Sequence, residues 1–212
     1  IPNTGFKRYN LRFNSDINVT DRLKLSMDIF LRKADKTEPS SGTGYVFHWM
    51  RRIPSNEVGV LSNGLYGEGW NGDHPLARAK DGGLRTEESL DAILNFRLNY
   101  NFTDWLSAEV MYAPKLWNPH VKSFSNITQT YARDGETPTF FVPQRNSLSE
   151  SYTREWYNNF RALVTIDKTF NDIHTFGFTA GYQQEDQTNQ WISAYREVFP
   201  LPDYQQINAG NR

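Results

Sequence analysis

The chain has 212 residues and a formal net charge of −1, from 23 basic and 24 acidic side chains. It lacks a basic stripe that would neutralise many phosphates, so its composition argues against a nucleic-acid partner. The absence of cysteine excludes a disulfide framework and thiolate metal sites, and no apolar run approaches the roughly 20 residues of a membrane helix.

The first predicted element is a strand at residues 8–19. Its odd positions from Tyr9 to Val19 are apolar, with Ser15 as the exception, and its even positions from Arg8 to Asn18 are all polar. A period of two predicts a β-strand with one apolar face and one polar face.

A second strand follows, and the two together predict a β-hairpin. The alternation resumes from Leu23 to Leu31, again with the apolar residues at odd positions. Paired residues on neighbouring strands share a face, so the two residue numbers of each pair must sum to an even number. We therefore predict a three-residue loop at 20–22, because a two-residue turn would break this parity.

The long segment that comes next is polar and rich in Gly, Ser and Pro. Within it, residues Tyr45 to Arg52 are predicted to form a short helix that ends at Pro54. A loop of this length inside a compact domain is usually functional or disordered. Its several aromatic residues favour an ordered loop.

The alternation returns in a second hairpin. Even positions from Leu90 to Phe102 are apolar, and after the turn at 103–105 the same parity continues to Tyr112. The loop must again contain an odd number of residues. Pro114 has no N–H for the ladder, so it predicts a bulge or the end of that strand.

A third hairpin has its turn at residues 171–173, between alternating runs from Tyr152 to Ile166 and from Phe176 to Tyr182. The whole organisation is then three hairpins at about 6–33, 86–116 and 150–186, and three long loops at about 34–85, 117–149 and 187–212.

The short turns, centred on Asp21, Asp104 and Asp172, alternate with the long loops. Outer-membrane barrels have short periplasmic turns and longer extracellular loops, whereas a soluble sandwich has no reason to separate the two kinds of connection. The predicted fold class is all-β: an antiparallel up-and-down transmembrane β-barrel segment of about six strands in three hairpins. The smallest bacterial barrels have about 8 strands, so the remaining strands must come from elsewhere.

Three stretches of the sequence, spread over nearly the whole chain, carry a family resemblance. They are RYNLRFNSDINVTDRLKL at 8–25, the loop segments RRIP at 51–54 and DHPLA at 73–77, and TFNDIHTFGFTAGYQQE at 169–185. They resemble the first half of the barrel of SusC/RagA-type TonB-dependent transporters. The family typically has Asn-Pro where this chain has His74-Pro75.

The resemblance implies a barrel of about 22 strands in the bacterial outer membrane, closed by an N-terminal plug. It implies import of large nutrients, oligosaccharides or peptides, with energy transmitted by TonB and with a SusD-like surface lipoprotein as a cap. The chain begins without an initiator Met and holds neither the plug nor a TonB-contacting segment. We therefore expect 1–212 to be a partial barrel domain of a larger protein, unable to transport alone.

Catalytic and metal-binding motifs are missing from the sequence. The histidines His48, His74, His120 and His174 are scattered without metal-ligand spacing, and each is interpreted as a solvated loop side chain. There is no G-x-S-x-G, P-loop or cysteine nucleophile. The sequence therefore predicts no enzyme activity, no cofactor and no metal.

Two candidate surfaces remain, and the first is the polar face of the strands. Its candidate residues are Arg8, Asn10, Arg12, Asn14, Lys24, Asp28, Arg32, Asn95, Arg97, Asn99, Glu109, Glu155, Asn159 and Arg161. In a barrel this face lines the lumen. The residues would contact a plug, which is the favoured interpretation for most of them, or the passing solute.

The second surface is formed by the loops. Its candidate residues are Tyr45, Phe47, Trp49, Arg51, Arg52, Tyr66, Trp70, Trp117, Tyr131, Phe140 and Phe141. Aromatic and arginine side chains are typical of protein interfaces, and aromatic rings also stack on sugars. Contact with a partner protein and packing of the loops on one another are equally open interpretations, and direct solute contact is a minor one.

Two rival functions belong to other classes. The first is a soluble β-sandwich that binds carbohydrate through its aromatic loops, and the second is a passive porin-like barrel. The favoured hypothesis is a barrel section of a TonB-dependent importer, in contact with membrane lipid, whose solute is a glycan or a peptide.

Overall fold

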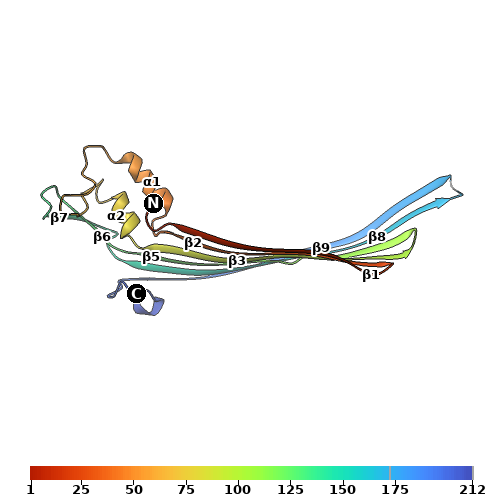
Figure 1. Ribbon diagram of the computed structural model, residues 1–212. Helices are drawn as coiled ribbons and strands as arrows, with labels where there is room; N and C mark the ends of the chain where they lie inside the picture. The colour runs from red at the N-terminus through yellow and green to blue at the C-terminus, as the bar shows by residue number, and fades with distance from the viewer. Residues whose placement is uncertain (172, 212) are drawn as a thin grey trace.

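The computed structural model describes residues 1–171 and 173–211, and it shows a long, thin antiparallel sheet (Figure 1). The strands of this sheet are β1 (Gly5–Thr20), β2 (Leu23–Pro39), β3 (Leu84–Thr103), β4 (Leu106–Tyr112), β5 (Lys115–Ser125), β8 (Ser147–Phe170) and β9 (His174–Glu197). The long loops contain α1 (Thr43–Arg52), α2 (Pro75–Lys80), the pair β6 (Thr128–Tyr131) and β7 (Pro138–Val142), and the short 3-10 helix η1 (Ile207–Ala209). All tight turns lie at one end of the sheet and all long loops at the other (Figure 1).

Strands β4 and β5 are two halves of one long strand. Tyr112 in β4 pairs with Phe96, and Lys115 in β5 pairs with Ile93 in the same register. Between them the N–H of Leu94 donates to the carbonyl of Pro114 at 3.0 Å. The interruption predicted at Pro114 is present. In the described part of the chain the sheet thus consists of six long strands in three hairpins, and the predicted fold class is confirmed.

The first two turns differ from the prediction. Thr20 pairs with Leu23 and Thr103 pairs with Leu106, which leaves two-residue turns instead of three-residue loops. The register shifts by one residue just before each turn, so a β-bulge restores the parity that a two-residue turn would break. The Thr20 hydroxyl supports its turn by accepting the N–H of Leu23 at 3.0 Å.

The third turn has the predicted length, because Phe170 pairs with His174. Asn171, its first residue, has a φ of 51°, the left-handed conformation that Asn tolerates in turns. The N–H of Ile173 donates to the carbonyl of Phe170 at 3.1 Å. Asp172, on which the prediction centred this turn, lies outside the described residues.

The strands continue beyond the predicted hairpin ends. Strand β2 ends at Pro39, β5 at Ser125 and β9 at Glu197, so residues 187–197 are strand and not loop as predicted. The ladder joins backbone groups and needs no apolar side chain, so polar residues stay paired wherever a neighbouring strand is present. The end of the hydrophobic alternation therefore does not mark the end of the strand.

The register brings the alternating residues of all strands onto two faces. On the apolar face, Leu31 pairs with Leu11 and Ala92, and Ala92 pairs in turn with Leu116. Leu116 pairs with Trp156 of β8. The opposite side is the polar face, and the helices α1 and α2 lie over it at the loop end (Figure 1).

The apolar face is largely uncovered. Leu11 is 59% exposed, Phe13 48% and Leu98 41%, and within the described residues no second sheet packs on them. A sandwich would bury such a face against another sheet. None of the described helices is both long enough and apolar enough to cross a membrane.

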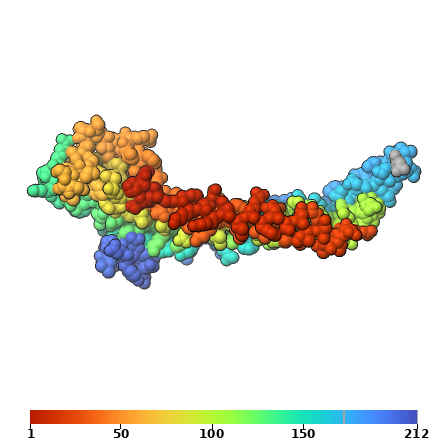
Figure 2. Space-filling model, in the orientation of Figure 1, coloured from red at the N-terminus to blue at the C-terminus, as the bar shows by residue number. Residues whose placement is uncertain are grey.

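A small cluster covers the apolar face at the loop end. Phe199, from the segment after β9, packs on Phe124 and Leu148, and all three are at most 4% exposed. The side chain of Asn146 holds this segment in place, because it accepts the N–H of Phe199 at 2.7 Å and donates to its carbonyl at 2.9 Å. In Figure 2 the segment protrudes on the side of the sheet away from the helices.

Candidate functional site

The polar face gathers all the residues predicted for it. The register places the following on one side of the sheet: Arg8, Asn10, Arg12, Asn14, Lys24, Asp28, Arg32, Asn95, Arg97, Asn99, Glu109, Glu155, Asn159 and Arg161. The sheet thus brings together residues that are up to 153 positions apart in the sequence.

Side chains on this face join neighbouring strands. Asp28 accepts from Asn14 at 2.5 Å and from Asn95 at 3.5 Å. Glu109 forms two ion pairs: its Oε1 lies 2.7 Å from Nη2 of Arg161, and its Oε2 lies 3.7 Å from Nε of Arg97. The polar face is therefore a network of hydrogen bonds and ion pairs that runs across the strands.

Two carboxylates of this network were not among the predicted site residues. Asp91 is 4% exposed and Glu38 is 7% exposed. Arg32 donates to Asp91 from two nitrogens, and Glu38 lies 2.8 Å from Arg85 and 3.1 Å from Lys36. Burial raises the pKa of Glu38, but the hydrogen bonds from Lys36 and Arg85 outweigh it and hold the pKa below its usual range.

The loops form a folded cap over the polar face, and two of its predicted residues hold it together. The Tyr45 hydroxyl donates to Asp73, and the Tyr66 hydroxyl donates to Asp81. Burial and these carboxylates raise the pKa of Tyr45 well above its usual value and that of Tyr66 to about 12. For both tyrosines the contact is with the loops themselves.

Other loop aromatics are open to solvent. Phe47 is 54% exposed, Trp70 49% and Phe141 47%. Trp49 contacts Arg52, whose guanidinium carbon lies 5.9 Å from the ring centroid. Arg51 and Arg52 are the last two residues of α1, Tyr131 is the last residue of β6, and Phe140 and Phe141 lie in β7.

Trp117 is not a loop residue as predicted. It lies in β5, where it pairs with Asp91 and Glu155 on the polar face. The prediction ended the strand too early, at residue 116, because the alternation stops there although the ladder continues.

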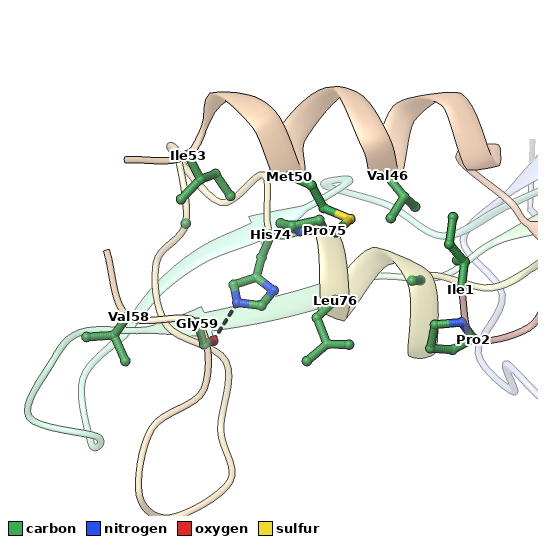
Figure 3. A pocket seen from close by; sticks show the side chains of 12 residues that line it. Ile1, Pro2, Val46, Met50, Ile53, Val58, Gly59, His74, Pro75 and Leu76 are labelled. Carbon is green, nitrogen blue, oxygen red and sulfur yellow. Dashed lines mark hydrogen bonds between the residues drawn. The ribbon is translucent and has the colours of Figure 1, made fainter. Parts of the chain in front are cut away.

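The interpretation of His74 as a solvated side chain is wrong. His74 is 3% exposed and caps α2, because its Nδ1 accepts the N–H of Ala77 at 3.1 Å. Its Nε2 lies 2.5 Å from the carbonyl of Gly59 (Figure 3). Helix α2 was not predicted, although Pro75 in its first turn is a sequence signal for a helix start. His74 thus does the capping for which Asn is well suited.

His120 is also not a free side chain. Its Nε2 lies 2.8 Å from a Glu150 oxygen, and its ring stacks on that of Tyr152 with centroids 4.0 Å apart. Within the described residues, no group of three or more His, Asp or Glu side chains forms a metal site.

Replacement of His74 by Ala is expected to destabilise the loop cap by ~1 kcal/mol, the usual cost of a lost helix cap. His74→Asn should retain most of the stability. The measurement is amide hydrogen exchange of residues 75–80 in the full-length protein. Equal protection in His74→Ala and the wild type would contradict the capping role.

The same cap is expected to be sensitive to acid. Burial lowers the pKa of His74, so the unfolded loop binds a proton more readily than the folded loop. The stability that the neutral ring provides is complete above the ordinary His pKa of about 6.5 and is lost as the pH falls through the folded pKa. The protection factors of the α2 amides, which are corrected for the pH dependence of intrinsic exchange, should therefore fall below pH 6.5 in the wild type but not in His74→Asn.

Arg78 joins the helices to the second loop. It is 7% exposed, and its Nη1 donates to the carbonyls of Val142 at 2.9 Å and Asn126 at 3.3 Å. Its guanidinium lies over the Tyr45 ring, 5.9 Å from the centroid. Burial lowers the pKa of Arg78. No periodicity signals this role, because its partners are backbone groups more than 40 residues away.

An apolar cavity of about 490 Å³ lies between α1 and α2 (Figure 3). Its lining includes Val46 and Met50 of α1, Pro75 and Leu76 of α2, and Ile1. The cap therefore contains an apolar space above a charged face.

No family model and no curated protein matches the sequence. Solved structures match the fold. One is described as the RagAB peptide transporter, with a TM-score of 0.71 at 14% sequence identity, and another as the RagAB peptide importer in the 'closed-closed' state, with a TM-score of 0.72 at 15% identity. The matches cover 99% of this chain and 23% of each solved chain. The chain thus has the fold of one part of a much longer transporter chain.

Proposed function

We propose that the chain is a section of the barrel wall and extracellular loops of a SusC/RagA-type TonB-dependent importer in the bacterial outer membrane. The observation that carries this proposal is the uncovered apolar face behind a polar, ion-paired face. A soluble sandwich would bury the apolar face. In a barrel of this type, lipid covers the apolar face, and the polar face lines the lumen.

The length of the apolar band supports this assignment. In β2 the band runs from Leu23 to Leu31, which is nine residues, and a tilted membrane strand needs about 9–11. Aromatic side chains such as Trp105 and Phe102 near the turns and Tyr9 near the loops lie at its borders. They would form the two interfacial girdles.

The position of the band also supports a barrel. The border toward the loops lies at Leu31 in β2. In β8 the unbroken apolar row ends at Phe160, before Asn158, and this is four residues nearer the turns than Trp156, the residue in the row of Leu31. The β8–β9 hairpin projects beyond the other turns accordingly (Figure 1). Strands tilted by about 35–45° cross a flat membrane with this kind of stagger.

The polar face and the loops have separate proposed partners. The polar face contacts a plug, with some of its residues along the solute passage, because its network leaves several buried groups such as Arg161 Nε without a partner within the described residues. The exposed loop residues Phe47, Trp70 and Phe141 contact a SusD-like surface lipoprotein. TonB acts on the protein through a region outside this chain.

We favour peptides over glycans as the solute, because the solved structures of the same fold are described as a peptide transporter and a peptide importer. The transport role involves no catalytic residue. The passive porin remains the second candidate. The two differ in energy requirement, because the importer depends on TonB and a passive pore does not.

The test uses cells that express the full-length protein and cells that lack its gene. We expect the protein in the outer-membrane fraction, and we expect uptake of labelled oligopeptides to depend on the gene, on TonB and on the proton motive force. Labelled oligosaccharides serve as the control solute. Uptake that persists without TonB would favour the passive pore, and recovery of the protein as a stable soluble species without detergent would overturn the barrel.

A further inference from the structure

The apolar face carries a polar patch where β8 and β9 leave the apolar band. The patch, here named the outer polar patch, lines a hollow of about 300 Å³ and consists of Arg154, Trp156, Asn158, Asp186, Thr188 and Gln190. All six have the same parity as Phe160 and Tyr182, where the unbroken apolar rows of the two strands end, and so point away from the polar face.

Part of the patch is held rigidly. Asn158 accepts from the Trp156 ring nitrogen at 2.8 Å and from the Tyr112 hydroxyl at 2.8 Å, and it donates to Asp186 at 3.0 Å. These bonds fix the indole ring and the carboxylate before any ligand arrives. Preorganised groups of this kind lower the entropic cost of binding.

The rest of the patch has unused hydrogen-bonding capacity. Within the described residues, the side chains of Arg154, Thr188 and Gln190 form no hydrogen bond or ion pair with another side chain. They supply guanidinium, hydroxyl and amide groups to the hollow.

A second hollow of about 410 Å³ adjoins the first and shares Arg154 and Gln190 with it. Tyr152 lines this hollow and is 52% exposed, and its ring is stacked on His120, which Glu150 anchors. Tyr152 and Trp156 flank Arg154 on one face of one strand, about 6.6–6.8 Å from it on either side, which is twice the strand rise. The surface thus offers two aromatic rings with a cation between them.

This combination suits a sugar chain better than a simple anionic lipid. Aromatic rings contact the apolar faces of sugars, and amide, carboxylate and hydroxyl groups bond to sugar hydroxyls. The patch contains one arginine and one aspartate, so it has no net charge to attract phosphates in general. The Arg154 guanidinium can still donate two parallel hydrogen bonds to one phosphate or carboxylate substituent.

We propose that the outer polar patch binds the sugar headgroup of a glycolipid in the outer leaflet. The inference rests on the proposed function, because the apolar face must be the lipid-facing side. The patch then lies directly beyond the lipid-facing band, at the height of the headgroups, on a surface that a solute in the lumen does not reach.

The experiment uses the purified full-length protein in detergent and measures its thermal unfolding with increasing lipooligosaccharide. The variants are Arg154→Gln, Trp156→Ala and, as the control on the opposite face of the same strand, Glu155→Gln. We expect lipooligosaccharide to raise the Tm of the wild type and of Glu155→Gln, and we expect each patch variant to need at least tenfold more of it. The lipid-free core oligosaccharide should compete.

Equal responses of the wild type and the patch variants would overturn the proposal. An equal rise in Tm with phosphatidylglycerol, lost in the same variants, would also overturn it, because the patch would then recognise anionic lipids in general. Arg154 is exposed, so Arg154→Gln remains informative if Trp156→Ala does not fold. Failure of the proposed function is distinguishable, because the protein would then be absent from the outer-membrane fraction before any lipid is added.

Discussion

Phe96→Arg is expected to destabilise the assembled full-length protein by ~2–4 kcal/mol, the cost of an arginine on the lipid face near the middle of the bilayer. Phe96 pairs with Met27 and Tyr112, and it lies in the middle of the apolar band. The measurement is the amount of folded protein in the outer membrane, together with reversible unfolding from lipid vesicles.

Asn95→Arg is the matched control, one residue earlier in the same strand. Asn95 lies on the polar face and donates to Asp28, so an arginine there gains a carboxylate neighbour. We expect a change below about 1 kcal/mol, as for ion pairs open to water. Similar losses in both variants would refute the assignment of the two faces.

Arg78→Ala is expected to loosen the loop cap by ~2–4 kcal/mol. The substitution leaves the carbonyl of Asn126 without its donor, at about 1–3 kcal/mol for an unsatisfied buried group. It also removes the charged donor of the Val142 carbonyl, at about 1.5–3 kcal/mol, although that carbonyl keeps its bond from the Thr128 hydroxyl. Loops 40–83 and 126–146 should then open together.

Protease cleavage of the loops on intact cells measures this opening. When opening is fast, cleavage follows the open population, so 2 kcal/mol corresponds to an increase of about 30-fold. Arg52→Ala is the control, because Arg52 contacts Trp49 at an exposed surface. If Arg78→Ala is cleaved at the same rate as the wild type, contacts other than those of Arg78 hold the cap.

The cap also explains why the loop residues divide into two groups. Tyr45 and Tyr66 donate to Asp73 and Asp81 within the cap, whereas Phe47 and Trp70 remain exposed. Their aromatic character in the sequence is the same. The tyrosines differ in that each has a hydroxyl and that folding brings an aspartate within its reach.

The sequence by itself determined the faces of the sheet. Side chains alternate strictly along a strand, so the parity of Leu11, Leu31 and Ala92 assigns each to the apolar face of its own strand, and paired strands share that face. The three hairpins and the separation of turns from loops follow from the same local pattern. The resemblance of the motifs to SusC/RagA-type transporters agrees with the fold likeness to the RagAB structures.

Only the tertiary structure decided the turn lengths, the strand ends and the buried polar residues. A bulge before Thr20 conserves parity with one residue fewer in the turn, and β9 stays paired after its apolar residues end. His74 and Arg78 are buried by segments distant in the sequence. The physical reason is that alternation is a local property, whereas burial and backbone pairing depend on which remote segment supplies the partner.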